Sequence, residues 1–374
     1  MNSTESHNAD RETLWLAPYA MHSCDTAGRE HPEPSHPYRG PYQRDRDRIV
    51  HSSAYRRLAH KTQVFAGEKG DYHRTRLTHT LEVASIARTI GRVLRLNEDL
   101  IEALALMHDI GHPPFGHSGE DILNEFTQEL GGFNHNQHAV RIVTELEIRY
   151  PEFPGLNLSK EILSGQQIRD KRGKAQTQPQ PLLEVQVVDA ADSIAYDAHD
   201  ADDALELGLL EMDDLRTVPL WEEAVSRVQS RYAGLDAKPF RQAVIHQLLD
   251  MLVSDLVEST CQRLDVENIA DTAAVANYGA RIVAPSEQMF EQKAELEKFL
   301  FTRVYRHPVI LAERAHAGEA LREMFQQFSQ SPARLPQSAR ARLEKDGVAR
   351  VVCDLLAGMT DRFALEAHQR LKDS

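Results

Sequence analysis

Residues 97–114, NEDLIEALALMHDIGHPP, decide the fold class of this chain and carry part of its chemistry. Asn97 is a good helix cap, and the acids that follow it favour the positive end of a helix dipole. Apolar residues then dominate until Gly111 and the prolines after it end the helix. The stretch therefore predicts a capped, buried helix with His108 and Asp109 near its end.

The helical pattern continues on both sides of this stretch. In residues 77–94 apolar side chains recur at intervals of three and four, and a helical pattern also begins at Asp47. Downstream, we expect helices from about Ser118 and over residues 133–150, and a long buried helix over residues 182–210. Strand alternation is almost absent, so the sequence predicts an all-α fold.

Two polar segments interrupt this pattern. Residues 1–40 contain several prolines and little periodicity, and we expect them to form a mobile N-terminal arm. Residues 164–181 are poor in apolar side chains, which is typical of a flexible loop. No composition break divides residues 41–374, so we expect them to form a single helical domain around that loop.

Composition and charge exclude several classes of protein. The 374 residues are 41 % apolar and 27 % charged, which is ordinary for a globular protein. No stretch approaches the roughly 18 apolar residues of a membrane span, the start does not resemble a secretion signal, and the three cysteines lack metal spacing. These features favour a cytoplasmic setting. The net charge of −14 argues against a broadly basic nucleic-acid-binding surface.

A local basic cluster stands out against this acidic background, in residues 44–61. It is compatible with a small anionic ligand held in a pocket, and equally with a solvated helix face.

Four separated polar residues suggest a metal centre. His108 and Asp109 are neighbours near a helix end, where both can reach one ion. His79 lies in an otherwise apolar stripe, and Asp192 lies among residues of core character. A lone buried histidine is more often structural, but a buried aspartate is costly unless it is paired or binds a metal. Two imidazoles and two carboxylates suit one divalent ion such as Mn, Mg, Fe, Co, Ni or Zn.

The order of these residues resembles the H…HD…D pattern of the HD phosphohydrolase superfamily. Longer stretches narrow the resemblance to the bacterial deoxyguanosine triphosphate triphosphohydrolase family. They are RDRDRIVHSSAYRRLAHKTQVF (44–65), RTRLTHTLEVASIAR (74–88), HDIGHPPFGHSGE (108–120), VVDAADSIAYDAHD (187–200), VYRHP (304–308) and AGMTDRFAL (357–365).

The resemblance implies an HD-type helical fold with additional C-terminal helices and a metal-dependent hydrolase. Such an enzyme converts a dNTP and water to a deoxynucleoside and inorganic tripolyphosphate, and its relatives are commonly homo-oligomers. A preference for dGTP, a nucleotide activator and accessory single-stranded DNA binding are compatible with the family and are not located by any motif. The alternatives are another HD-type nucleotidase or phosphodiesterase, or a non-catalytic nucleotide sensor or single-stranded DNA binder.

The resemblance also implies residue roles. The metal ligands by this criterion are His79, His108, Asp109 and Asp192. His117, nine residues after His108, matches the family's catalytic histidine. An imidazole near neutral pKa suits proton transfer to a leaving oxygen. Glu120, one helical turn later, can support His117, although an acid there also fits a helix cap after Ser118. His112 joins this catalytic group because its counterpart lies near the phosphate.

Substrate contacts are implied for five more residues. Arg76 shares a helix face with His79 and can clamp phosphate oxygens or form a surface salt bridge. Tyr196 and Asp200 continue the helix stripe of Asp192, and their counterparts contact the deoxyribose.

Gln63 matches a residue that contacts the sugar 3′-hydroxyl, and His135 matches another active-site histidine. The chain departs from some relatives at Ser193, where they have a phosphate-binding lysine.

Overall fold

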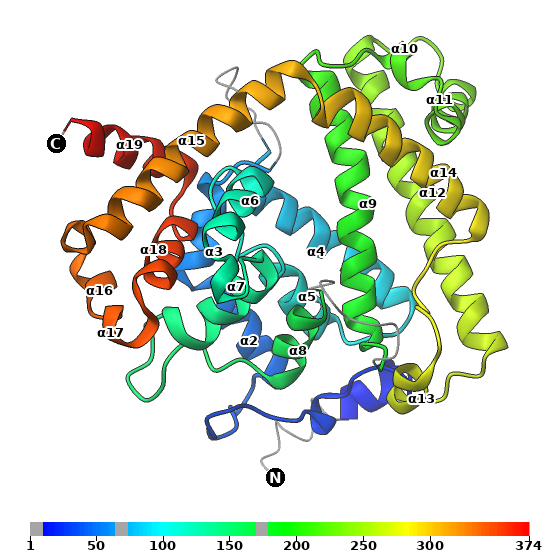
Figure 1. The fold of residues 1–374 in the computed structure, drawn as a ribbon. Coiled ribbons are helices and arrows are strands. Elements are labelled where there is room, and N and C mark those ends of the chain that lie inside the picture. Colours follow the sequence, from blue (N-terminus) through cyan, green and yellow to red (C-terminus); the bar gives the residue numbers. More distant parts are fainter. Residues whose placement is uncertain (1–9, 64–73, 170–178, 374) are drawn as a thin grey trace.

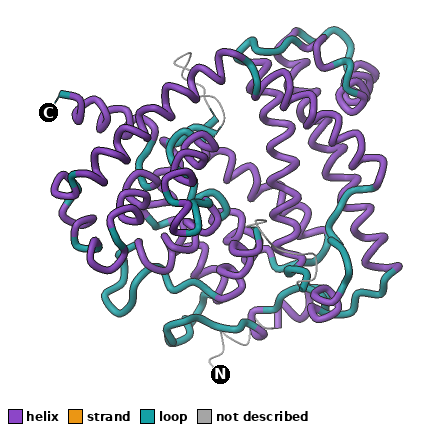
Figure 2. The backbone as a smooth tube through the Cα atoms, viewed as in Figure 1, coloured by secondary structure: helices purple, strands orange, loops and turns teal. Residues whose placement is uncertain are grey.

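The computed structural model describes residues 10–63, 74–169 and 179–373, and these ranges are almost entirely helices and their connections (Figures 1 and 2). Three isolated β-bridges occur within them, and no strand does. The all-α prediction is therefore confirmed. Among the same residues, no helix combines the length and the apolar character needed to cross a bilayer.

The α-helices are α2 (Pro41–Val50), α3 (Ser53–Arg57), α4 (Arg76–Val93), α5 (Glu98–Met107), α6 (Gly116–Phe126), α7 (His135–Arg141), α8 (Lys160–Ile168), α9 (Leu183–Glu206), α10 (Met212–Leu215), α11 (Pro219–Arg231), α12 (Ala237–Val266), α13 (Thr272–Asn277), α14 (Glu287–Leu300), α15 (Pro308–Gln330), α16 (Gln337–Arg340), α17 (Leu343–Asp346), α18 (Val348–Ala357) and α19 (Asp361–Lys372). Short 3₁₀ turns are η1 (Ser23–Asp25), η2 (Leu58–His60), η3 (Gln128–Leu130) and η6 (Pro332–Arg334), and π-helical turns are η4 (Ile142–Leu146) and η5 (Phe301–Tyr305).

The helices α4, α5 and α9 pack on one another at the centre, and α2 and α12 cover them (Figure 1). A large apolar cluster fills the space between them. A smaller cluster joins α6 to the C-terminal helices α15, α18 and α19. The C-terminal quarter of the chain is thus packed against the helix that follows the histidine-rich stretch.

The helix predicted from residue 97 is present. The Asn97 side chain accepts a hydrogen bond from the Leu100 backbone N–H, and α5 ends where His108 forms its C-cap. Most of its residues are buried, as expected for a helix that packs on three sides.

The helical pattern expected from Asp47 is divided between two helices. α2 already begins at Pro41, and Ser52 starts α3 by accepting a hydrogen bond from the Tyr55 backbone N–H. A capping serine inside an apparently continuous pattern is the physical reason for the break.

Residues 10–40 of the expected mobile arm contact the core, while residues 1–9 lie outside the described residues. Ala17 and Ala20 are buried in the core. The backbone N–H of Met21 donates to the buried Glu184 carboxylate at 2.9 Å. The arm is held by buried polar contacts with residues far along the chain, which its own composition does not reveal.

Arg29 makes several of these buried polar contacts. Its guanidinium pairs with Asp45, whose side chain is fully buried, and also donates to the carbonyl oxygens of Asn157 and Pro41. Asp45 has one other partner there, the Ser159 backbone N–H at 3.2 Å. Burial raises the pKa of Asp45, and the Arg29 cation opposes that rise.

We expect Arg29→Met to lower the free energy of unfolding by about 3 kcal/mol, because it leaves a buried carboxylate without its cation. Denaturant titration measures the change. Adding Asp45→Asn to this variant should recover part of the loss, and Arg362→Met on the exposed face of α19 should change nothing measurable. A loss below about 1 kcal/mol would show that the arm is not fastened by this pair.

The loop predicted at residues 164–181 is wrong at its start, residues 179–181 form a connection without regular structure as expected, and residues 170–178 lie outside the described residues. Residues up to Ile168 continue α8. Gln166 is buried and donates from its side-chain amide to the His108 carbonyl oxygen at 3.0 Å. Gln180 donates from its backbone to the Ala276 carbonyl oxygen. The polar composition suggested solvent exposure, but the Gln166 side chain forms an internal hydrogen bond instead.

Candidate active site

Three helices bring the expected metal ligands together. His79 lies on α4, His108 and Asp109 lie at the end of α5, and Asp192 lies on α9. The His79 Nε2 atom is 3.0 Å from Asp192 Oδ1, and the His108 Nε2 atom is 3.6 Å from the same oxygen. One donor atom from each of these three side chains lies within 4.8 Å of the others, so the group could hold a metal ion.

The orientation of His108 fits a ligand. Its Nδ1 atom lies 2.6 Å from the Ala105 carbonyl oxygen, which can only accept, so Nδ1 carries the ring hydrogen. The lone pair is then on Nε2, which is buried and has no hydrogen-bond partner within the described ranges. A carbonyl that orients the far nitrogen is the usual support of a metal-binding histidine, and an orphaned buried nitrogen facing carboxylates calls for a cation.

Asp109 adds a fourth potential ligand, the second carboxylate, at the edge of this group. Its Oδ1 atom is 3.5 Å from His108 Nε2 and 3.3 Å from His112 Nε2. Its Oδ2 atom accepts from Arg76 Nη1 at 2.7 Å. Burial alone would raise the pKa of Asp109, but the neighbouring basic side chains, His108 and Arg76 first among them, hold it well below its usual range. The carboxylate is therefore ionised and available to a metal.

A second group of polar side chains lies beside the first. It contains His112, Glu120 and His135, whose ligand atoms also lie within 4.8 Å of one another. Glu120 Oε2 is 3.0 Å from His135 Nδ1 and 3.6 Å from His117 Nδ1. The predicted His117–Glu120 pair is thus brought together, and Glu120 has a closer partner in His135.

The imidazoles of this second group differ in environment. His112 is buried, stacks on His135 with ring centroids 3.8 Å apart, and has a pKa held well below its usual range by burial and neighbouring cations. The His117 side chain is 64 % exposed, so a substrate can reach it. Gly111 makes the close packing feasible, because a Cβ there would lie 2.0 Å from the His135 carbonyl oxygen.

The loop between His112 and α6 is clamped by distant residues. Phe115 caps α6 in the left-handed region, at φ +63°, which is unfavourable for a side chain of this size. Asp361 accepts from the Phe115 backbone N–H at 3.0 Å and from the Thr62 backbone N–H at 2.8 Å. The buried Lys61 ammonium donates to the His112 carbonyl oxygen at 2.5 Å. The strained loop that places His117 is therefore held by two charged side chains.

We expect Asp361→Ala to lower kcat by about tenfold or more, because the loop is free to relax and small displacements of reacting groups are costly. The metal content should be unchanged, since no proposed ligand contacts Asp361. Thr360→Ala is the matched control, because Thr360 caps the same helix without touching the loop. Steady-state kinetics checks the prediction, and equal kcat values for the two variants would contradict it.

On the far side of the metal group, α9 carries Tyr196 and Asp200. Asp200 accepts a short hydrogen bond from the Tyr305 hydroxyl, and the rings of Tyr196 and Tyr305 stack with centroids 5.8 Å apart. Burial raises the pKa of Asp200 to about 7. The π-helical turn η5 that delivers Tyr305 includes part of the VYRHP motif, to which sequence analysis assigned no role.

Arg76 and Gln63 are adjacent, since Arg76 Nη2 donates to the Gln63 carbonyl oxygen at 3.4 Å. The Gln63 side-chain oxygen is buried and lacks a hydrogen-bond partner in the described part of the chain. The surface salt bridge considered for Arg76 is excluded, because its side chain is buried against Asp109.

Two cations near the metal group were missed by sequence analysis. Arg169 donates to Asp192 Oδ2 at 2.6 Å and lies 3.0 Å from Asp189 Oδ1. Lys293, on α14, donates to the Ser193 hydroxyl at 2.8 Å. A lysine from the C-terminal half thus reaches the position where some relatives carry one on α9. No local motif marks either residue, because both contacts are long-range.

In the basic cluster at residues 44–61, Arg44 and Arg48 are paired with an acid. Glu33 lies 3.3 Å from Arg44 and 2.7 Å from Arg48. The interpretation of this cluster as a solvated helix face is wrong for Arg48, because Arg48 is buried.

Comparison with known proteins matches two family models to this chain. The HD domain model covers residues 76–197, the range that contains all four expected metal ligands, His117 and Glu120. The phosphohydrolase-associated domain model covers residues 283–370, which includes α14, Tyr305 and Asp361.

Curated proteins called deoxyguanosinetriphosphate triphosphohydrolase-like are similar along nearly the whole chain. A protein from Geobacter sulfurreducens is 42 % identical over 367 residues, 95 % of this chain and 94 % of its own length. A protein from Cereibacter sphaeroides is 42 % identical over 95 % of this chain and 99 % of its own length. A protein from Brucella ovis is 42 % identical over 96 % of this chain and 95 % of its own length.

Proposed function

The chain belongs to the HD-domain family of deoxyguanosinetriphosphate triphosphohydrolase-like proteins, and from this membership and its site we propose that it hydrolyses deoxynucleoside triphosphates to deoxynucleosides and inorganic tripolyphosphate. Membership makes it an HD-type phosphohydrolase. The observation that carries the finer proposal is that His117 and Glu120 lie beside a group of buried imidazoles and carboxylates that could hold a metal. The names of the relatives make dGTP the first substrate to test.

The ligands in this proposal are His79, His108, Asp109 and Asp192. The orphaned Nε2 of His108 and the ionised carboxylate of Asp109 fit a single divalent cation. A bound ion would supply Lewis acidity and lower the pKa of an attacking water. Arg169 and Arg76 each hold the outer oxygen of one carboxylate, which leaves the inner oxygens facing the histidines.

In the proposed reaction water attacks the α-phosphorus, and the 5′-oxygen of the sugar leaves with a proton. We assign the donation of that proton to His117, and its exposed imidazole, 3.6 Å from Glu120, supports this assignment. Glu120 is ionised, since burial is outweighed by the two histidines that lower its pKa.

The remaining residues bind the substrate in this account. Arg76 and His112 line the Asp109 side of the site and would contact the phosphates. His135 would support Glu120 from the other side. Tyr196 and Asp200 would contact the deoxyribose, with the Tyr305 hydroxyl giving way to a sugar hydroxyl on Asp200.

Gln63 would contact the 3′-hydroxyl, and its unpartnered side-chain oxygen is consistent with a ligand contact. A tyrosine ring at C2′ leaves no space for a ribonucleotide hydroxyl, so GTP is expected to be a poor substrate.

The proposal is tested by anion-exchange analysis of the products from each dNTP and from GTP, with Mn²⁺ or Mg²⁺. Tripolyphosphate from a dNTP and none from GTP is the expected result. Orthophosphate or pyrophosphate would favour another HD-type nucleotidase. If nucleotides or single-stranded DNA bind and no product forms from single dNTPs or mixtures, the chain is a sensor or a DNA-binding protein.

A further inference from the structure

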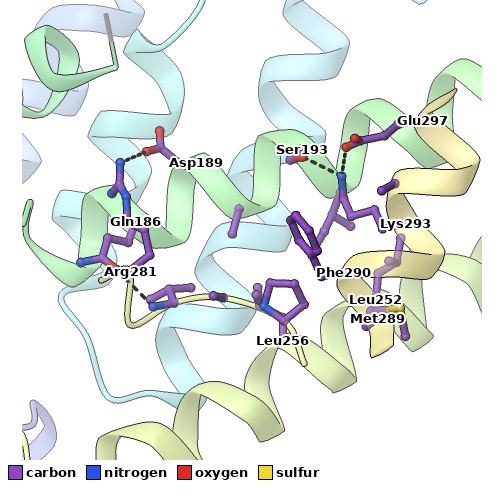
Figure 3. A pocket seen from close by; sticks show the side chains of 16 residues that line it. Gln186, Asp189, Ser193, Leu252, Leu256, Arg281, Met289, Phe290, Lys293 and Glu297 are labelled. Atoms are coloured by element: carbon purple, nitrogen blue, oxygen red, sulfur yellow. Dashed lines mark hydrogen bonds and ion pairs between the residues drawn. The ribbon is translucent and has the colours of Figure 1, made fainter. Parts of the chain in front are cut away.

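A cavity of about 490 Å³ lies between α9, α12 and α14, closed at one end by residues 281–285 (Figure 3). None of the residues assigned above to the metal, to proton transfer or to the substrate lines it. Its size is within the range of small-molecule sites, which is about 300–1,000 Å³.

The wall of this cavity is apolar. It is formed mainly by Ile194 on α9, Leu252 and Leu256 on α12, and Met289 and Phe290 on α14. Phe290 is 64 % exposed, which is unusual for a large aromatic residue beside a cavity. The surface therefore suits the apolar body of a ligand, and an aromatic or aliphatic group would cover it.

The polar groups are confined to two ends, as Figure 3 shows, and the Lys293 end is already neutralised. The Lys293 ammonium lies 2.6 Å from the buried Asp197 carboxylate, pairs with Glu297 and donates to Ser193. Two carboxylates satisfy this one cation, so it has little to offer a charged ligand.

The Arg281 end has cationic capacity left. Arg281 Nη2 is 3.4 Å from Asp189 Oδ2, but Asp189 is shared with Arg169 at 3.0 Å. The Nη1 atom of Arg281 is buried, and within the described ranges it has no hydrogen-bond partner. One carboxylate thus serves two guanidinium groups, and a donor is left open beside the apolar wall.

We propose that this cavity binds a small organic anion, with its carboxylate, phosphate or sulfonate group on Arg281 and its apolar body against α12 and α14. The two ends orient the ligand, because only the Arg281 end accepts an additional negative charge. The residues that line this site are different from those assigned to the proposed reaction.

The cavity is connected to the expected metal centre by ion pairs. Asp192 contacts Arg169, Arg169 contacts Asp189, and Asp189 contacts Arg281. A ligand anion on Arg281 therefore acts on the same chain of charges that holds the metal ligand Asp192 on α9.

The test compares a charged and a neutral fluorescent probe of nearly the same shape on the full chain. Anilinonaphthalenesulfonate carries the anionic group, and phenylnaphthylamine lacks it. Arg281→Gln should weaken the sulfonate probe about tenfold or more and leave the neutral probe within about twofold, since a charge-assisted hydrogen bond contributes 1.5–3 kcal/mol.

A second variant tests the location without touching the charge. Ala294 lines the cavity from an exposed position on α14, so Ala294→Trp should fill it and weaken both probes about tenfold. Glu295→Trp, at the exposed neighbouring position outside the lining, is the matched control and should leave both affinities unchanged.

Unchanged sulfonate binding in Ala294→Trp would overturn the proposal, because the probe would then bind elsewhere. Equal loss of both probes in Arg281→Gln would overturn the assignment of the anion to Arg281. Neither result bears on hydrolysis, since tripolyphosphate release is measured separately.

Discussion

Replacement of His108 with alanine is expected to remove the metal from the protein and to lower hydrolysis by more than about 100-fold. Loss of a mere hydrogen-bond partner of a metal ligand typically costs 10–100-fold, and removal of a ligand itself should cost more. His108 lies between the two carboxylates of the group, because its Nε2 atom is 3.5 Å from Asp109 Oδ1 and 3.6 Å from Asp192 Oδ1. Elemental analysis of metal-loaded, desalted protein gives the ion content directly.

The control for this variant is His138→Ala. His138 is also buried, and its Nδ1 lies 3.8 Å from a carboxylate, that of Asp354, but it is outside both groups of potential ligands. Its loss should lower stability and leave the ion content near one per chain. If the His108 variant keeps a full complement of metal while remaining folded by circular dichroism, the proposed ligand set is wrong.

Replacement of His117 with alanine is the second large effect. We expect kcat to fall by about 10²–10⁴-fold, the usual contribution of a general acid, with the metal content unchanged. A nitrophenyl ester of tripolyphosphate, whose phenolate leaves without needing a proton, should be much less affected. This contrast separates proton donation from a merely structural role.

His135→Ala is the informative comparison, because Glu120 is closer to His135 than to His117. If His135 only supports Glu120, its loss should be smaller than that of His117 and, because it acts through His117, should also be relieved by the activated substrate. A larger loss in His135→Ala, relieved by the activated ester, would transfer the role of proton donor to His135.

The parts of the fold that sequence predicts well are those encoded locally. The Asn97 cap, together with Gly111 and the prolines after it, locates α5 within a few residues. The long helix expected at residues 182–210 contains α9. Three of the expected metal ligands, His79, His108 and Asp192, lie within reach of one another, and Asp109 adjoins His108 at 3.5 Å, because the HD pattern records positions on these regular helices.

Features built from long-range polar contacts could not be predicted in this way. The sequence predicts a mobile arm because nothing in residues 1–40 indicates that Arg29 binds Asp45 and Asn157. Likewise, Asp361 and Lys61 hold the loop between His112 and α6, and both are far from this loop in sequence. In both cases a charged residue with an ordinary local setting becomes important only through its folded partner.

The most direct test of the proposed reaction is hydrolysis of dGTP in ¹⁸O-labelled water, with mass analysis of both products after chromatographic separation. Attack at the α-phosphorus with release of the 5′-oxygen predicts intact tripolyphosphate carrying one labelled oxygen and an unlabelled deoxyguanosine. Labelled orthophosphate, labelled pyrophosphate or a labelled nucleoside would contradict the account, because each requires a different bond to break.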